Sequence, residues 1–245
     1  MTLLEVCTST PAGIDEAIAG GAGRIELCSA LAEGGLTPSI GLISLAARKP
    51  VKVNVLIRPR EGDFVYTDEE IAVMEADIRE AVKAGADGIV TGALTPEGDI
   101  DAEACRRLID AAGDADTTFH RAFDVCRDPF EALETVISLG FKRILTSGQA
   151  PTAPAGAETI RELHRAAAGR IKIMAGSGVS PANAALLLEL SGADEIHASA
   201  RALKPSAMRL ADKGVKMGNA DASDGSRLDT DSQTVRAIRA AIENA

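Results

Sequence analysis

Short apolar runs alternate with longer amphipathic segments along the whole chain. Short runs rich in isoleucine, valine and leucine are typical of parallel strands that are covered on both faces. They predict strands at residues 3–8, 24–28, 51–57, 88–91, 117–120, 143–146, 171–175 and 195–198. The segments between them have helical periodicity and predict helices at residues 11–20, 39–48, 68–84, 101–112, 128–139, 157–168, 181–190 and 234–243.

A short sequence motif recurs where a predicted helix ends and the next strand begins. It joins a glycine near the end of a helix to a charged residue and then to an isoleucine. It occurs at residues 22–25, 85–89, 140–144 and 192–196. Glycine suits the left-handed conformation in which many helices end, so the motif supports the predicted boundaries.

Eight strands that alternate with eight helices predict a parallel sheet with right-handed crossovers. The length of 245 residues fits a closed (β/α)8 barrel of the TIM type. An open doubly wound sheet is the alternative, but the first turn lacks the G-x-G-x-x-G fingerprint that would support it. We expect residues 1–245 to form one barrel domain, in which residues 202–233 are a long loop before the last helix because they lack a clear period.

The charge and cysteine content narrow the class of protein. A net charge of −10 argues against a nucleic-acid groove or binding to an anionic membrane surface. No apolar stretch approaches the ~18 residues of a membrane span, and the amino terminus lacks the basic region of a signal peptide. Four cysteines without a dense framework indicate reduced thiols. We therefore expect a cytoplasmic protein with no nucleic-acid or membrane partner.

The first two predicted strands share a Glu-x-Cys pattern. The two-residue period of a strand places Glu5 with Cys7 on one face, and Glu26 with Cys28 on one face. Thiolates beside carboxylates suit either metal capture or acid/base chemistry. Two thiolates can hold Cu(I), whereas a structural zinc site needs four ligands, and no C-x-x-C spacing supplies them.

Polar residues gather where the predicted strands end, which is where barrel enzymes place their active sites. His120 can titrate near neutrality, Arg121 offers a fork for carboxylate or phosphate, and Asp124 could orient either of them or act as a base. The candidate catalytic residues are Glu5, Glu26, Arg58, His120, Arg121, Asp124 and His197. In the alternative interpretation, Glu5, Glu26 and Arg58 form a buried ion cluster that holds the barrel end together.

Glycine and serine follow the later strands. Glycine lets backbone N–H groups approach an anion, and the loops after strands seven and eight of barrels often bind phosphate. The candidate anion-binding residues are Ser147, Gly148, Gly176, Ser177, Gly178, Ser199 and Arg201. The alternative is a tight turn that caps the following helix.

Several motifs occur together in a fixed order. They are LEVC at residues 4–7, GAGRIELC at 21–28, GGLTPS at 34–39, VLIRPR at 55–60, TFHRAFD at 118–124, LTSG at 145–148 and IHASAR at 196–201. With these motifs the chain resembles the copper-homeostasis CutC family over residues 3–245. The resemblance implies a TIM-type barrel in the cytoplasm, a homo-oligomer, and Cu(I) binding and trafficking through Cys7 and Cys28.

Two functions therefore stay open. The first is the Cu(I) binding that the resemblance implies. The second is an acid/base lyase, isomerase or hydrolase without an evident organic cofactor, acting on a small anionic or sugar-like molecule. Glu5 and Glu26 are hard ligands that match Cu(I) poorly, which favours the enzyme. No lysine occupies an evident inward strand-end position, which disfavours a Schiff-base aldolase.

Overall fold

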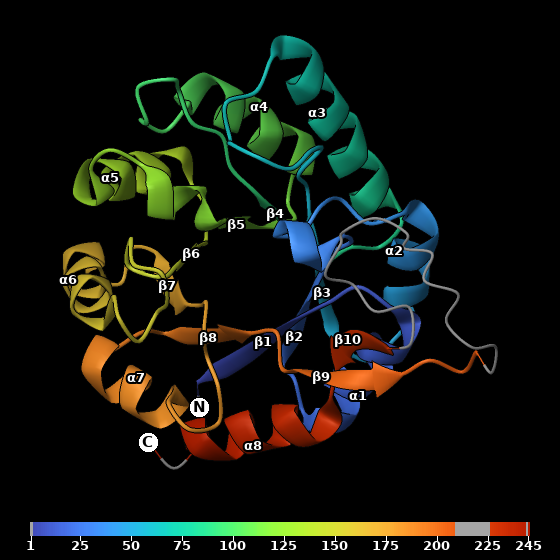
Figure 1. Cartoon of the computed structure of the whole chain (residues 1–245). Coiled ribbons are helices and arrows are strands. Elements are labelled where there is room, and N and C mark those ends of the chain that lie inside the picture. The colour runs from blue at the N-terminus through green and yellow to red at the C-terminus, as the bar shows by residue number, and fades with distance from the viewer. Residues whose placement is uncertain (1, 209–225, 244) are drawn as a thin grey trace, which may run out of the picture.

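Eight parallel strands form a closed barrel in the computed structural model, which describes residues 2–208, 226–243 and 245 (Figure 1). Each strand pairs with its neighbours in chain order, and β8 closes the ring against β1. The strands are β1 (Leu3–Thr8), β2 (Arg24–Leu27), β3 (Lys52–Leu56), β4 (Gly88–Thr91), β5 (Asp116–Phe119), β6 (Arg143–Thr146), β7 (Lys172–Ala175) and β8 (Glu195–Ala198). The predicted (β/α)8 barrel is confirmed.

Helices form an outer ring around the strands (Figure 1). They are α1 (Pro11–Gly20), α2 (Ile40–Ala46), α3 (Asp68–Lys83), α4 (Ala102–Ala112), α5 (Pro129–Leu139), α6 (Ala157–Ala167), α7 (Ala184–Ser191) and α8 (Ser232–Glu243). Thr67 and Glu70 close a capping box at the start of α3, as their spacing predicts. Within the described ranges, no helix is long and apolar enough to cross a membrane.

The two faces of each strand bury different kinds of side chain. Outward residues such as Val6, Ile25 and Ile89 belong to the large apolar core that includes the inner faces of the helices. A much smaller apolar cluster of Cys7, Cys28, Leu56 and Val90 is separate from that core. Because side chains alternate along β1, Glu5 lies on the same inward face as Cys7.

A network of buried charges occupies the barrel interior below that small cluster. Arg24 in β2 forms ion pairs with Glu5 in β1 and Glu195 in β8. Arg143 in β6 also pairs with Glu195, at 3.1 Å from Nε, and with Asp116 in β5. Because isolated charges are costly to bury, each arginine depends on these carboxylates.

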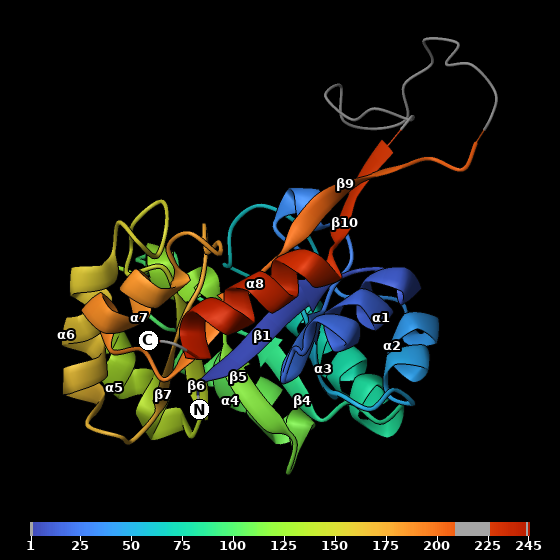
Figure 2. The same ribbon diagram turned by 90° about the horizontal axis from the view of Figure 1, so that it is seen from below.

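A two-stranded antiparallel ribbon rises from the barrel beyond β8 (Figure 2). It consists of β9 (Arg201–Pro205) and β10 (Ser226–Thr230). The predicted loop at 202–233 therefore contains regular structure, and its central part, residues 209–225, lies outside the described residues. The ribbon is tied to the barrel because Asp229 accepts hydrogen bonds from Thr10, and Thr230 donates one to Thr8.

Removal of Arg24 should destabilise the barrel strongly. In Arg24→Met, both Glu5 and Glu195 lose a buried cation, and breaking such a pair typically costs about 3–5 kcal/mol in the free energy of unfolding. Urea unfolding at pH 7 measures this change.

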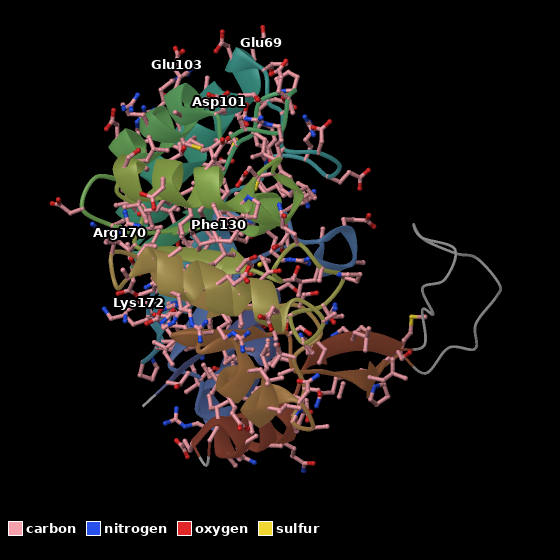
Figure 3. All side chains as sticks on the ribbon, turned by 90° about the vertical axis from the view of Figure 1, so that its left-hand side faces the viewer. Glu69, Asp101, Glu103, Phe130, Arg170 and Lys172 are labelled. Carbon is pink, nitrogen blue, oxygen red and sulfur yellow. The ribbon has the colours of Figure 1, made fainter. Side chains whose placement is uncertain are left out.

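Arg170→Gln is the matched control, since Arg170 pairs with the exposed Glu134 and lies at the end of the barrel away from the ribbon (Figure 3). An exposed pair contributes less than about 1 kcal/mol. Equal losses in the two variants would contradict the role given to Arg24.

Candidate metal and small-molecule site at the barrel mouth

A cavity of about 510 Å³ opens at the carboxyl end of the strands. We call it the mouth cavity. Its apolar lining comes from Leu31, Leu56, Phe64, Val125, Leu145 and Val179. Its polar lining consists of Cys7, Glu26, Glu33, Arg58, His120, Arg121, Asp124, Ser177, His197, Ser199 and Arg201. Six of the seven candidate catalytic residues therefore meet in one place, and the seventh, Glu5, lies behind His197.

One wall of the cavity brings together three possible metal ligands. The Cys7 sulfur, a Glu26 carboxylate oxygen and a His197 ring nitrogen all lie within 4.8 Å of one another, and all three residues are buried. They come from the adjacent strands β1, β2 and β8, so the barrel closure between β8 and β1 assembles them. We call this set the Cys–Glu–His cluster.

Glu5 orients the histidine of this cluster. Its Oε1 lies 2.8 Å from His197 Nδ1. Burial raises the pKa of Glu5, but the hydrogen bond with His197 and the charge of Arg24 together lower it to about 2. Since the ionised Glu5 accepts the Nδ1 proton, His197 Nε2 is directed to the Glu26 side, 3.8 Å from Oε2.

The charge state of His197 follows from its neighbours. Burial lowers the pKa of His197, but hydrogen bonds with Cys7 and Glu5 and the charge of Glu26 raise it well above its ordinary value. The imidazole is therefore cationic at neutral pH before any metal binds. A metal ion must displace the proton on Nε2 to use this nitrogen as a ligand.

The two Glu-x-Cys segments have different roles. Cys7 lines the cavity, whereas Cys28 does not, and its thiol donates a hydrogen bond to Glu26 Oε2 at 3.3 Å. Burial and the charge of Glu26 raise the pKa of Cys28 well above its usual range. Burial also raises the pKa of Glu26. Cys28 is thus a protonated thiol that positions the Glu26 carboxylate.

His120 lies on the opposite wall as a neutral imidazole. It is 4% exposed, and burial together with the charge of Arg58 lowers its pKa to about 3. Its Nδ1 accepts a hydrogen bond from the Ala122 backbone N–H at 3.3 Å, so the ring proton is on Nε2. The ring packs between Phe64 and Phe119, which fixes its orientation.

Arg58 does not pair with the carboxylates of β1 and β2. Its guanidinium donates to the backbone carbonyls of Glu33, Gly35 and Gly62 and stacks on Phe64. The alternative interpretation of a buried ion cluster therefore named the wrong cation. The arginine that pairs with Glu5 is Arg24, not Arg58. Arg24 is directly opposite Glu5 in the strand register, whereas Arg58 lies beyond the end of β3 at the rim.

Asp124 braces Arg121 at the rim. Its Oδ2 lies 2.7 Å from Arg121 Nε, and Ser147 Oγ accepts a further hydrogen bond from the same guanidinium at 3.1 Å. Asp124 also accepts from the Thr146 hydroxyl and the Ser147 backbone N–H. Both carboxylate oxygens are thus engaged, which favours positioning of Arg121 over a role as a free base.

The candidate anion-binding residues separate into two groups. Ser177, Gly178, Ser199 and Arg201 line the cavity, whereas Ser147, Gly148 and Gly176 do not. The backbone N–H groups of the second group already donate to Asp124, Thr146 Oγ1 and the Thr146 carbonyl.

Gly176 has a packing role at this site. A Cβ at Gly176 would lie 2.6 Å from Leu145 Cδ1 and 3.1 Å from His197 Cβ. The missing side chain therefore makes room for the histidine of the cluster.

Sequence reasoning missed Arg24, which pairs with Glu5, and Glu195, which pairs with Arg24. Both stand two residues before a recognised candidate, Arg24 before Glu26 and Glu195 before His197. The two-residue period of a strand, extended by one step, would have placed them on the inward face. The repeated helix-to-strand pattern identifies them only as charged residues at the start of a strand.

Fold and site together define a (β/α)8 barrel protein with a Cys–Glu–His cluster in a mouth cavity. The model of the CutC family matches residues 2–202. A CutC family protein of Vibrio vulnificus is 50% identical over 224 residues, covering 90% of each chain. The human copper homeostasis protein cutC homolog is 46% identical over 244 residues, covering 99% of this chain and 89% of the relative. The chain belongs to the CutC family.

Solved structures agree with this assignment. The crystal structure of CutC from Streptococcus agalactiae superposes with a TM-score of 0.78 at 36% identity and covers 81% of this chain and 99% of that one. An aldolase, QR15, superposes with a TM-score of 0.61 at 21% identity, covering 80% of this chain and 89% of that one. The second likeness shows the barrel fold alone.

The depressed pKa of His120 predicts a pH-dependent stability. In the unfolded chain a histidine takes up its proton near pH 6.5, whereas folded His120 does so only near pH 3. Acidification in this window therefore favours the unfolded state, by up to about 1.4 kcal/mol per pH unit. Between pH 6.5 and 4.5, the free energy of unfolding of His120→Gln should fall by roughly 2 kcal/mol less than that of the native chain. Urea unfolding at the two pH values measures this difference.

Groups elsewhere in the barrel titrate equally in both chains, so the comparison isolates His120. Parallel pH profiles for the two chains would show that folding does not lower the pKa of His120.

Proposed function

We propose that this chain binds Cu(I) in the cytoplasm as part of copper homeostasis, with Cys7 and Cys28 as its thiolate ligands and His197 as a nitrogen ligand. The observation that carries the proposal is the approach of the Cys7, Glu26 and His197 ligand atoms to within 4.8 Å of one another. Relatives named copper homeostasis protein at 46–47% identity support it.

Ligand chemistry suggests an order of binding. Thiolate and imidazole are suitable ligands for Cu(I), whereas carboxylate prefers harder ions. Cys7 and His197 face the cavity, so an entering ion meets them first. Cys28 can join only after its thiol gives up the hydrogen bond to Glu26. In this proposal Glu26 accepts the proton that Cys28 loses.

Cys7→Ser should weaken Cu(I) binding most, by at least 100-fold, because it removes the thiolate that faces the cavity. Cys28→Ser should weaken it less, since Cys7 and His197 remain. The measurement is a Cu(I) titration against a competing chelator. Cys126→Ser is the matched control, because Cys126 lies outside the cluster beside Gln149. Equal affinities for Cys7→Ser and the control would remove the thiolate claim.

Glu5→Gln should lower Cu(I) affinity by roughly 10- to 100-fold through the orientation of His197, as replacement of carboxylates behind metal-bound histidines commonly does. Glu195→Gln is the control for the charge network, because Glu195 pairs with Arg24 and Arg143 and forms no ion pair with His197 among the described residues. Both variants lose one buried charge. A similar affinity loss in both would assign the effect to barrel stability instead of histidine orientation.

A further inference from the structure

The mouth cavity is far larger than a metal ion needs. Its volume of about 510 Å³ lies in the range of pockets that hold small organic molecules, about 300–1,000 Å³. The Cys–Glu–His cluster occupies only the wall formed by β1, β2 and β8. The remaining walls carry polar groups that a copper site does not use.

His120 presents an unsatisfied hydrogen-bond donor on one of these walls. Its Nε2 is buried and has no hydrogen-bond partner among the described residues, and the ring lines the cavity. Arg58 also lines the cavity and contacts the same Phe64 ring. Its Nε is likewise buried without a hydrogen-bond partner among the described residues. Buried polar groups are nearly always paired, so two such donors beside one cavity suit a ligand that carries a hydrogen-bond acceptor.

Two arginines lie at the rim of the cavity. Arg121 is held in place by Asp124 and Ser147 while its side chain stays 44% exposed. Arg201 lies at the start of β9 and also lines the cavity, and it forms no ion pair within the part of the chain that the structure describes. A guanidinium held this way suits a carboxylate or phosphate, whose oxygens accept two parallel hydrogen bonds.

We propose that the mouth cavity binds a small organic anion, with its carboxylate or phosphate at Arg121 and Arg201 and a hydroxyl or carbonyl oxygen on the Nε2–H of His120. The far end of such a molecule then lies towards Glu26 across the cavity. The apolar residues Leu31, Leu56 and Val179 limit its size. This site does not depend on copper. It would be the substrate site of the acid/base enzyme that the sequence leaves open as an alternative.

The test uses metal-free full-length protein with ¹⁵N-labelled histidine. The chain has three histidines, so the imidazole spectrum contains three rings, which single substitutions assign. The probes are glycerate, glycerol phosphate and glycerol, which share hydroxyl groups and differ in their anion. We expect one of the two anions to shift the His120 Nε2–H resonance saturably, while glycerol leaves it unchanged. The anion that acts identifies carboxylate or phosphate as the recognised group.

Arg121→Gln and Arg201→Gln should each weaken the active probe at least tenfold, and Arg170→Gln at the opposite end of the barrel should leave it unchanged (Figure 3). Circular dichroism confirms that each variant folds. The proposal is overturned if neither anion shifts His120, or if both rim variants bind the probe as the native chain does. The Cu(I) affinity of the native chain is measured in a separate titration, so failure of either proposal can be recognised independently.

Discussion

The ion pairs that Arg24 makes inside the barrel are the constraint on which the rest of the site depends. Arg24 neutralises the buried charges of Glu5 and Glu195. Glu5 in turn forms a hydrogen bond with Nδ1 of His197. Charges buried this deeply are tolerated only when each has its partner and its hydrogen bonds. The orientation of His197 at the mouth therefore depends on the ion pair between Arg24 and Glu5 in the layer beneath it.

The mouth has two chemically distinct walls above this network. On one wall, hydrogen bonds with Cys7 and Glu5 keep His197 cationic and Cys28 keeps its proton beside Glu26, so protons must leave before a soft metal can bind. On the other wall, burial and Arg58 keep His120 neutral, and its Nε2–H has no acceptor within the part of the chain that the structure describes. One histidine is held charged and the other uncharged across a single cavity, which is the kind of separation that acid/base chemistry exploits.

Sequence patterns were sufficient for the barrel because its determinants are local. Apolar runs of strand length, helical periods and glycine-terminated helices all repeat along the chain, and they agree with one another. The same patterns identified most of the cavity-lining residues, since barrel topology brings the strand ends together. They assigned Arg58 to the wrong partners and gave Gly176 a binding role, where the structure shows carbonyl contacts for Arg58 and close packing against His197 for Gly176.

The sequence by itself determined the order of strands and helices, the shared strand face of Glu5 with Cys7 and of Glu26 with Cys28, and most of the polar residues that gather at the mouth. Only the tertiary structure decided which of them touch. Closure of β8 against β1 brings Glu5 to His197, 192 positions apart in the chain, and the register between β1 and β2 brings Arg24 to Glu5. Such pairings depend on strand register and barrel closure, so the charge of each histidine, the different roles of Cys7 and Cys28, and the division of the mouth into two walls emerge only in the folded chain.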